Sequence, residues 1–364
     1  MRMAMASQVM TFWSMVFLHL IVVSPILANS PLAPAMYVFG DSLVDNGNNN
    51  YLPTFAKANF LPYGDAFPKG STGRFTNGKT VADFIADYLG LPYPPPYMSL
   101  NGQKSLIGVN YASGSCGILP ESGARLGKCL DLKEQINLFE MTVKMNLVIE
   151  IENPTQISNH LSKSIFIFST GSNDYINNYL DKEHFNTSKL YQPKTFAEIL
   201  VENLSLHIER VYNLGARKII MFEIGPVGCI PSVLRNLTHK GDCIEEVNQM
   251  VTYFNERLPP LVKNLTSRLP GSNIVLGRDH SLGYDVIKNP SKYGLTEARH
   301  PCCTTWANET SGCIPLSKPC PHPTKHVFWD AFHLTETVYS IIASGCLKNG
   351  SICTPVSIPE LVKM

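Results

Sequence analysis

The stretch MYVFGDS, residues 36–42, is an apolar run that ends at a glycine and two polar residues. The same pattern returns at residues 165–168 before STGSND, at 218–224 before GPVGC and at 273–276 before GRD. Strands with nearly continuous hydrophobicity are typical of parallel sheets that are buried on both faces. These four runs therefore predict the strands of one parallel sheet.

Helix-length amphipathic segments separate the predicted strands. Residues 195–214 place most of their apolar side chains on one stripe, and Gly215 ends the pattern. Residues 243–269 continue similarly, although Pro259 and Pro260 are expected to break or kink this helix. The alternation predicts an α/β layer fold, whose functional sites lie at the carboxyl ends of the strands.

Composition and charge limit the classes to which the chain can belong. Of its 364 residues, 44% are hydrophobic and 16% are charged, which excludes a disordered chain. The 30 basic and 29 acidic residues give a formal net charge of +1, so we predict no nucleic-acid partner. The length allows one large domain or two average ones, and we expect one because no internal repeat or long linker occurs.

The first 28 residues have the pattern of a secretory signal peptide. Arg2 provides the positive charge, residues 11–23 form the apolar segment, and Ala28 is a suitable cleavage position. The alternative is an uncleaved membrane anchor, but the apolar segment is shorter than the ~20 residues of a membrane span. We predict a secreted protein with a single domain at residues 29–364 and no stable membrane span after cleavage.

Ten cysteines, an even number in a chain predicted to be exported, favour disulfide bonds. Spacing does not determine their connectivity, and the pairs close in sequence that we expect are Cys116–Cys129, Cys229–Cys243 and Cys313–Cys320. The alternative is a zinc site, because cysteines and histidines cluster at residues 302–326. The paired CxxC spacing of zinc sites is missing, so we predict no metal site.

Six Asn-x-Ser/Thr sequences without an intervening proline predict N-glycosylation. One such sequence is weak support because the pattern is short, but six beside a signal peptide predict a surface with several glycans. The asparagines are Asn186, Asn203, Asn236, Asn264, Asn308 and Asn349.

Ser42, Asp330 and His333 are the candidate residues for chemistry. Ser42 stands on the turn that leaves the first predicted strand, although serine at such a junction often only caps a helical turn. A serine nucleophile needs a base, and the base needs an orienting acceptor. Residues 328–333, FWDAFH, offer both, because a spacing of three lets the Asp330 carboxylate orient the His333 imidazole. The alternative for His333 is a packed histidine bonded to a neighbour.

Two loops contain candidate donors for the oxyanion that forms during acyl transfer. Residues 171–174, GSND, follow a predicted strand, and the Asn173 amide can extend over the sheet edge. Residues 108–118, GVNYASGSCGI, are glycine-rich, so backbone N–H groups there can approach a ligand closely. This loop also suits a phosphate, but it lacks the Walker lysine pattern and a GxGxxG motif, so we predict no nucleotide.

Six separated blocks, taken in order, resemble the plant-type GDSL esterase/lipases of the SGNH hydrolase superfamily. The blocks are FGDSLVDNGNNN, TGRFTNGKTVADFIADYLG, GVNYASGSCGI, STGSNDY, GPVGCIP and FWDAFHLTE, within about residues 37–339. The resemblance implies a three-layer α/β/α sandwich of the flavodoxin-like type with a parallel sheet. It also implies ester hydrolysis without a cofactor. Ser42 then matches the nucleophile and one oxyanion donor, Asp330 the orienting acid and His333 the general base.

The resemblance also assigns the other oxyanion donors. Asn173 matches the side-chain donor, and the backbone donor falls on Gly114 or on its neighbour Ser115. The chain departs from the usual pattern at Ser115, where many relatives have glycine, and at Leu334, where proline usually follows the histidine. Neither departure removes a catalytic group.

The leading prediction is a secreted serine ester hydrolase that cleaves carboxylic esters of lipids or other acylated plant metabolites through an acyl-enzyme. A second hypothesis is an acyltransferase that passes the same acyl group to an alcohol. A third is a secreted binding glycoprotein with weak catalysis. Six aromatic residues near the catalytic blocks either line an apolar cleft or belong to the core, and these are Tyr51, Phe55, Phe60, Tyr63, Phe67 and Tyr175.

Overall fold

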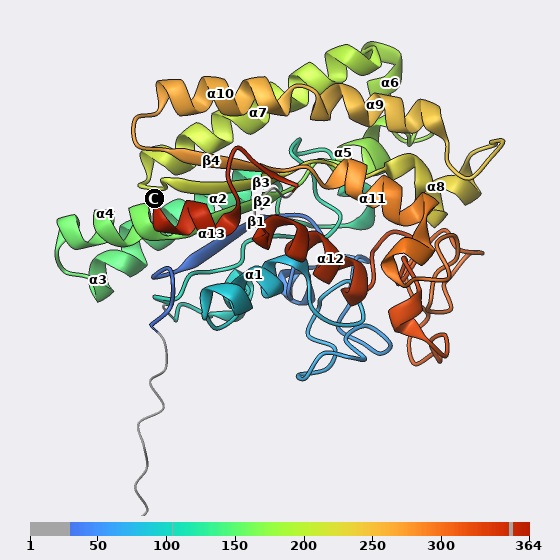
Figure 1. The fold of residues 1–364 in the computed structure, drawn as a ribbon, viewed down its shortest axis with the longest axis horizontal. Helices are drawn as coiled ribbons and strands as arrows, with labels where there is room; N and C mark the ends of the chain where they lie inside the picture. The colour runs from blue at the N-terminus through green and yellow to red at the C-terminus, as the bar shows by residue number, and fades with distance from the viewer. Residues whose placement is uncertain (1–29, 104, 349–351) are drawn as a thin grey trace, which may run out of the picture. The chain divides into compact units, whose positions relative to one another are not determined.

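A five-stranded sheet forms the centre of the computed structural model, which describes residues 30–103, 105–348 and 352–364 (Figure 1). The strands lie in the order β1 (Met36–Gly40), β2 (Ile165–Ser169), β3 (Lys218–Phe222), β4 (Asn273–Gly277) and β5 (Cys353–Thr354). Strands β1 to β4 are parallel, and β5 pairs antiparallel with β4. Every residue of β1, β2 and β3 is buried, which confirms the interpretation of their continuous hydrophobicity.

An irregular segment, residues 107–113, lies beside β1 on the side away from β2. The N–H groups of Met36 and Val38 donate to the carbonyls of Ile107 and Val109, and the Ser113 N–H donates to the Gly40 carbonyl at 3.0 Å. The segment runs parallel to β1, with a bridge from Val38 to residue 110. It therefore brings the glycine-rich loop that follows it next to the carboxyl end of β1.

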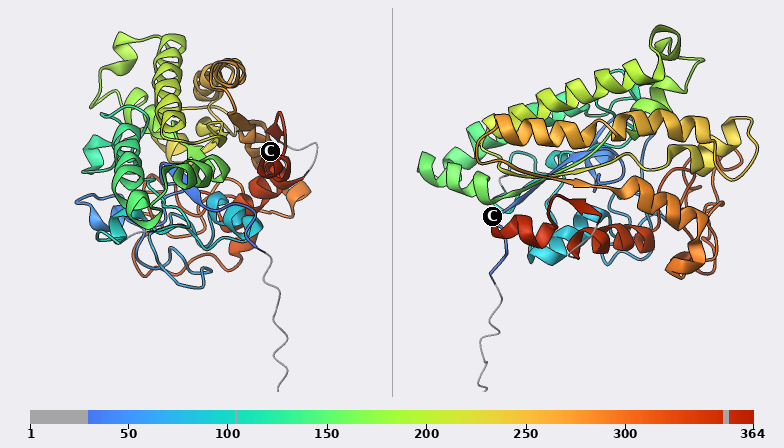
Figure 2. Two further views of the ribbon diagram at one scale, coloured as in Figure 1. Left: turned by 90° about the vertical axis from the view of Figure 1, so that its left-hand side faces the viewer. Right: turned by 45° about the horizontal axis from the view of Figure 1, so that its top comes forward.

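Helices cover both faces of the sheet, which gives the three layers expected for the family that the sequence resembles (Figures 1 and 2). One layer contains α2 (Leu132–Met141), α7 (Pro193–Asn213), α9 (Glu245–Asn255) and α10 (Leu258–Arg268). The other contains α1 (Val81–Leu89), α12 (Glu336–Leu347) and α13 (Ile358–Lys363). The remaining α-helices are α3 (Val148–Glu150), α4 (Pro154–Lys163), α5 (Ser172–Asp174), α6 (Thr187–Leu190), α8 (Pro231–Asn236) and α11 (Asp279–Lys288).

The predicted helices agree with the observed ones. Helix α7 corresponds to the predicted residues 195–214, and its stripe, including Phe196, Leu200 and Ile208, is buried. The predicted helix at residues 243–269 is broken into α9 and α10. The break lies just before Pro259 and Pro260, because proline is tolerated in a first turn but not in the interior of a helix.

Five disulfide bonds join all the cysteines of the chain: Cys116–Cys129, Cys229–Cys243, Cys302–Cys320, Cys303–Cys313 and Cys346–Cys353. The first two predicted pairs are confirmed, and the predicted pair Cys313–Cys320 is wrong. Cys302 and Cys303 donate their N–H groups to two successive carbonyls, those of Phe328 and Trp329. Cys320 donates its N–H to the Cys302 carbonyl at 2.7 Å, so it lies beside Cys302, and Cys313 is left to pair with Cys303.

Residues Pro31–Met364 form one compact unit. The predicted signal peptide, residues 1–28, lies outside the described residues, as does the predicted glycosylation site Asn349. Among the described helices, none combines the length and the apolar character that a membrane span requires.

Candidate active site

Ser42 lies on the turn after β1, at the carboxyl end of the sheet. The turn requires glycine at position 40, where φ is +152° and a Cβ atom would lie 2.0 Å from the Ser169 carbonyl oxygen. The Gln135 side chain holds this glycine from α2, accepting from its N–H at 2.9 Å and donating to its carbonyl at 2.8 Å. Ser42 itself is only 8% exposed.

His333 is positioned between Ser42 and Asp330. Its Nε2 lies 2.7 Å from the Ser42 Oγ, and its Nδ1 lies 2.8 Å from each Asp330 carboxylate oxygen. The Asp330 Oδ1 accepts the backbone N–H groups of Phe332 and His333, while the Trp329 N–H closes the turn onto the His333 carbonyl at 2.7 Å. The structure thus brings Ser42 together with Asp330 and His333, and Ser42 and His333 are 291 positions apart in the sequence.

The environment of Asp330 favours its charged form although the carboxyl is fully buried. Burial acts to raise its pKa, but the neighbouring His333 and hydrogen bonds from His333 and Tyr63 hold the pKa below its ordinary value. An ionised Asp330 is suited to accept the Nδ1–H of His333, which leaves Nε2 free to accept the Ser42 proton.

The glycine-rich loop places Ser115, and not Gly114, where a ligand can be bound. The Gly114 N–H donates to the buried Asp45 carboxylate at 3.0 Å, and its carbonyl accepts from the Asn49 amide at 2.9 Å. Ser115 has a positive φ of 71° and lines the pocket that contains Ser42. Of the two positions matched by the resemblance, Gly114 is therefore already engaged, and Ser115 is the better candidate.

Asn173 lines the same pocket from α5, the short helix that follows β2 in the sequence. Its Nδ2 donates to the Cys116 carbonyl at 3.0 Å, and its Oδ1 accepts from Asn177 Nδ2 at 2.8 Å. These two bonds orient the amide so that its NH₂ group faces the glycine-rich loop. Asn177, on the π-helix Tyr175–Tyr179, was not predicted as a site residue, although it stands four positions after Asn173.

Tyr63 is the second residue that sequence reasoning missed, since we predicted it only as an aromatic of the cleft or core. Its hydroxyl donates to the Asp330 Oδ2 at 2.5 Å, and both groups are buried. The tyrosine comes from the long loop after β1, which has no helical or strand pattern that would place it. No sequence signal brings it to Asp330, because the two residues are 267 positions apart.

The pocket beside Ser42 has a volume of about 310 Å³. Its inner wall is mainly apolar and comes from the loop after β3 and from α11 and α12, through Val227, Ile230, Val286, Val338 and Ile342. Of the six aromatic residues, Phe55 and Tyr63 line the pocket, Phe67 and Tyr175 are buried, Phe60 packs beside Tyr63, and Tyr51 is exposed.

The chain matches the family described as GDSL-like lipase/acylhydrolase over residues 36–345. It is 46% identical to GDSL esterase/lipase 7 of Arabidopsis thaliana over 347 residues, or 92% of this chain and 94% of that protein. The chain belongs to the GDSL-like lipase/acylhydrolase family. Two further GDSL esterase/lipases of the same plant are each 40% identical, covering 91% and 92% of this chain and 91% and 86% of their own lengths. The chain is therefore a hydrolase that acts on ester bonds, as its six sequence blocks predict.

Further carboxyl groups of this hydrolase are buried, and one of them, Asp41, lines the pocket. Burial raises the pKa of Asp41 to about 7, and its Oδ2 has no hydrogen-bond partner among the described residues. Burial also raises the pKa values of Asp45 and Asp174 to about 6, against the hydrogen bonds that each accepts. Asp174 holds the glycine-rich loop through the N–H groups of Ile118 and Leu119.

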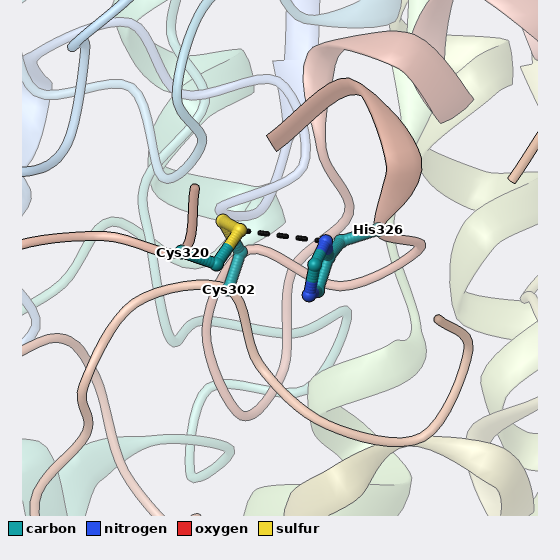
Figure 3. Close-up of side chains that lie close together, drawn as sticks. All are labelled: Cys302, Cys320 and His326. Atoms are coloured by element: carbon teal, nitrogen blue, oxygen red, sulfur yellow. Dashed lines mark hydrogen bonds between the residues drawn. A yellow bond between two sulfur atoms is a disulfide. The ribbon is translucent and has the colours of Figure 1, made fainter. Parts of the chain in front are cut away.

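The cysteine and histidine cluster that suggested zinc contains Cys302, Cys320 and His326 (Figure 3). The His326 Nδ1 lies 3.4 Å from the Cys320 Sγ, but that sulfur is bonded to Cys302. A disulfide has no thiolate to offer, and a lone imidazole is a poor zinc site. The cluster therefore serves as a covalent link between two loop segments of the hydrolase.

The glycosylation predictions can be compared with exposure for five asparagines. Asn186, Asn236, Asn264 and Asn308 are exposed. Asn203 is partly buried within α7, where its Nδ2 donates to the Ile199 carbonyl at 2.8 Å. Glycan attachment at these positions and at Asn349 stays a prediction.

Proposed function

We propose that the hydrolase cleaves carboxylic esters of lipids or other acylated metabolites with Ser42 as its nucleophile. The observation that carries this proposal is the contact of 2.7 Å between His333 Nε2 and Ser42 Oγ, with Asp330 on the opposite ring nitrogen. A serine, a base and an orienting carboxylate in this order are the requirements for activating a hydroxyl group.

In the first half-reaction, the Ser42 Oγ attacks the acyl carbonyl carbon while its proton passes to His333 Nε2. The imidazolium that forms is stabilised by the Asp330 carboxylate. When the tetrahedral intermediate collapses, the bond to the alcohol breaks, and the alcohol leaves with the proton from His333. Water then attacks the acyl-enzyme by the same route, which releases the acid and restores Ser42.

The oxyanion of the intermediate needs hydrogen-bond donors, each of which contributes about 10²–10³ in rate. We assign this role to the N–H groups of Ser42 and Ser115 and to the Asn173 amide. Ser115 replaces Gly114 in the assignment because the Gly114 N–H is engaged with Asp45. The apolar inner wall of the pocket supports an acyl chain as the group bound next to Ser42.

We also propose that the hydrolase is secreted after residues 1–28 are removed. The five disulfide bonds support this location, because disulfides persist in oxidising compartments. N-terminal sequencing of protein collected from the medium of plant cells tests the cleavage position. A first residue near Asn29 is expected, and retention of the chain in membranes with residues 1–28 attached would contradict the proposal.

The test of the catalytic proposal compares the mature wild type with Ser42→Ala on p-nitrophenyl esters from acetyl to palmitoyl. Ser42→Ala should lower kcat on the order of 10⁶-fold if the three residues act as a unit. The control is Ser272→Ala, a buried serine whose hydroxyl donates to the Leu269 carbonyl away from the pocket, and its activity should be unchanged.

A fluorophosphonate probe separates the remaining outcomes, because only an activated serine should react with it. Full activity of Ser42→Ala would overturn the assignment. A wild type that labels but does not hydrolyse any ester would favour an acyltransferase, which product analysis with added alcohols identifies. A wild type that neither turns over nor labels would favour the binding glycoprotein.

A further inference from the structure

We infer that Tyr63 is a positioning residue that holds the carboxylate of Asp330 for catalysis. The inference rests on the proposed function, in which Asp330 orients and stabilises His333. Hydrogen bonds connect four side chains in a row, from Tyr63 through Asp330 and His333 to Ser42, with no joining distance above 2.8 Å.

The two oxygens of Asp330 share the His333 ring but otherwise have different partners. Oδ1 accepts the backbone N–H groups of Phe332 and His333, which hold the carboxylate near its own main chain. Oδ2 accepts only from side chains, namely the Tyr63 hydroxyl and the His333 ring. A fully buried carboxylate oxygen without donors carries a large desolvation cost, so the tyrosine supports the charged form that the base requires.

The Tyr63 hydroxyl is itself held in one orientation. The Cys313 N–H donates to it at 3.1 Å, which leaves the phenol proton to be donated to Asp330. The ring packs edge-on against Phe60 and Phe75. Gly312 leaves the necessary room, since a Cβ atom there would lie 2.8 Å from the hydroxyl oxygen. Functional side chains that must keep one orientation are typically held by packing and hydrogen bonds on several sides.

The surroundings keep the tyrosine a donor. Burial and the neighbouring Asp330 charge raise the pKa of Tyr63 well above its ordinary value, so the phenol is protonated wherever the enzyme works. Among the described residues, Tyr339, beside Asp330 and Asp41, and Asp41 itself, beside His333, are titratable groups that also face this row. Neither Tyr339 nor Asp41 donates a hydrogen bond to Asp330 Oδ2 in the part of the chain that the structure describes.

The experiment compares Tyr63→Phe with Tyr111→Phe in the mature glycoprotein. Tyr111 is a matched control, because it is fully buried and its hydroxyl donates to Thr142 Oγ1 at 2.7 Å away from the pocket. Tyr63→Phe should lower kcat about tenfold on a p-nitrophenyl ester with KM within about twofold of the wild type. Tyr111→Phe should change the melting temperature but neither kinetic constant.

The pH profile provides a readout that a purely structural role would not move. Without the phenol, the negative charge of Asp330 is no longer stabilised by the Tyr63 hydrogen bond, so the carboxylate attracts the His333 imidazolium more strongly. The acid limb of kcat/KM should therefore move to higher pH by about half a unit. In the Asp330→Asn background, Tyr63→Phe should have almost no further effect on kcat, because Tyr63 acts through the carboxylate.

If Tyr63→Phe does not fold, replacement of Tyr63 by 3-fluorotyrosine keeps the size and the hydroxyl but strengthens the donor. The acid limb should then move to lower pH, opposite in direction to Tyr63→Phe. The inference is overturned if kcat and the acid limb stay at wild-type values in each Tyr63 variant that folds while Ser42→Ala is inactive. A wild type that neither hydrolyses esters nor labels would overturn the proposed function, and this inference with it.

Discussion

Asp41, next to the proposed nucleophile, is a buried carboxyl whose Oδ2 lacks a partner among the described residues. In the folded chain it retains its proton up to about pH 7, whereas in an unfolded chain the proton is lost near pH 4. Between these pH values the folded state binds more protons than the unfolded state, so the free energy of unfolding decreases as pH rises. The stabilisation is fully present below pH 4 and is lost as pH passes 7.

Asp41→Asn removes this dependence because the amide does not ionise. Relative to the wild type, the variant should be more stable at pH 8 than at pH 5 by about 2 kcal/mol, or roughly 4 °C in melting temperature. Thermal melts at the two pH values measure the difference. Asp65→Asn, at an exposed position, is the control. Its melting temperature should differ from that of the wild type by the same amount at both pH values. An Asp41→Asn effect that does not depend on pH would contradict the assignment of the buried charge.

Residues within short blocks were predictable, and residues that depend on distant partners were not. Ser42 follows a strand directly, and Asp330 and His333 stand three positions apart, so local spacing was enough to propose them. Tyr63 reaches Asp330 only through the tertiary fold. The engagement of the Gly114 N–H depends on the Asp45 carboxylate, 69 positions earlier, and no pattern within the glycine-rich loop contains that information.

At the scale of elements, the strands buried on both faces were the most predictable because burial demands an unbroken apolar run. The segment at residues 107–113 beside β1 was missed because Asn110 and Ser113 interrupt its hydrophobicity. Both polar side chains are buried and bonded: Asn110 Nδ2 donates to the Val44 carbonyl at 2.7 Å, and Ser113 Oγ donates to Asn49 Oδ1 at 2.6 Å. A buried polar side chain forms hydrogen bonds within the protein instead of with water. Its burial therefore cannot be predicted from the pattern of hydrophobic residues in the sequence.

The loop closed by Cys303–Cys313 supports Asp330 from two directions. Cys303 donates its N–H to the Trp329 carbonyl, immediately before Asp330, and Cys313 donates its N–H to the Tyr63 hydroxyl. Cys303→Ala with Cys313→Ala should therefore lower kcat about tenfold, besides a loss of about 2–3 kcal/mol in the free energy of unfolding. Kinetics at a temperature where the variant is fully folded, together with denaturant unfolding, separate the two effects.

The matched control for this disulfide is Cys346→Ala with Cys353→Ala. The two cysteine pairs close loops of similar length, with sequence separations of 10 and 7, so both variants should lose comparable stability. Only the first should lose activity, because it closes the loop whose N–H groups donate to the Trp329 carbonyl and the Tyr63 hydroxyl, whereas the second disulfide joins α12 to β5. Equal losses of kcat in the two variants would mean that the effect comes from general destabilisation.

At the scale of the whole molecule, the candidate catalytic residues lie at the carboxyl edge of the sheet in the three-layer fold. Alternation of strands and helices predicts this edge as the site, and Ser42 and Asn173 come to it from β1 and β2. The pocket beside them is assembled from the loop after β3 and from α11 and α12, and its size depends on how those elements pack. Sequence blocks therefore predict the reacting groups of an enzyme better than they predict the shape of its substrate site.

The inner wall of that pocket should determine the length of the acyl chain. Ile342 lines it from α12, and phenylalanine at this position would occupy part of the 310 Å³. Ile342→Phe should lower kcat/KM for the longest accepted p-nitrophenyl ester about tenfold and leave the acetyl ester within about twofold of the wild type. Ser344→Phe, on the exposed side of the same helix, is the control and should keep the wild-type profile. A parallel decrease for all chain lengths in Ile342→Phe would mean that the acyl chain binds elsewhere.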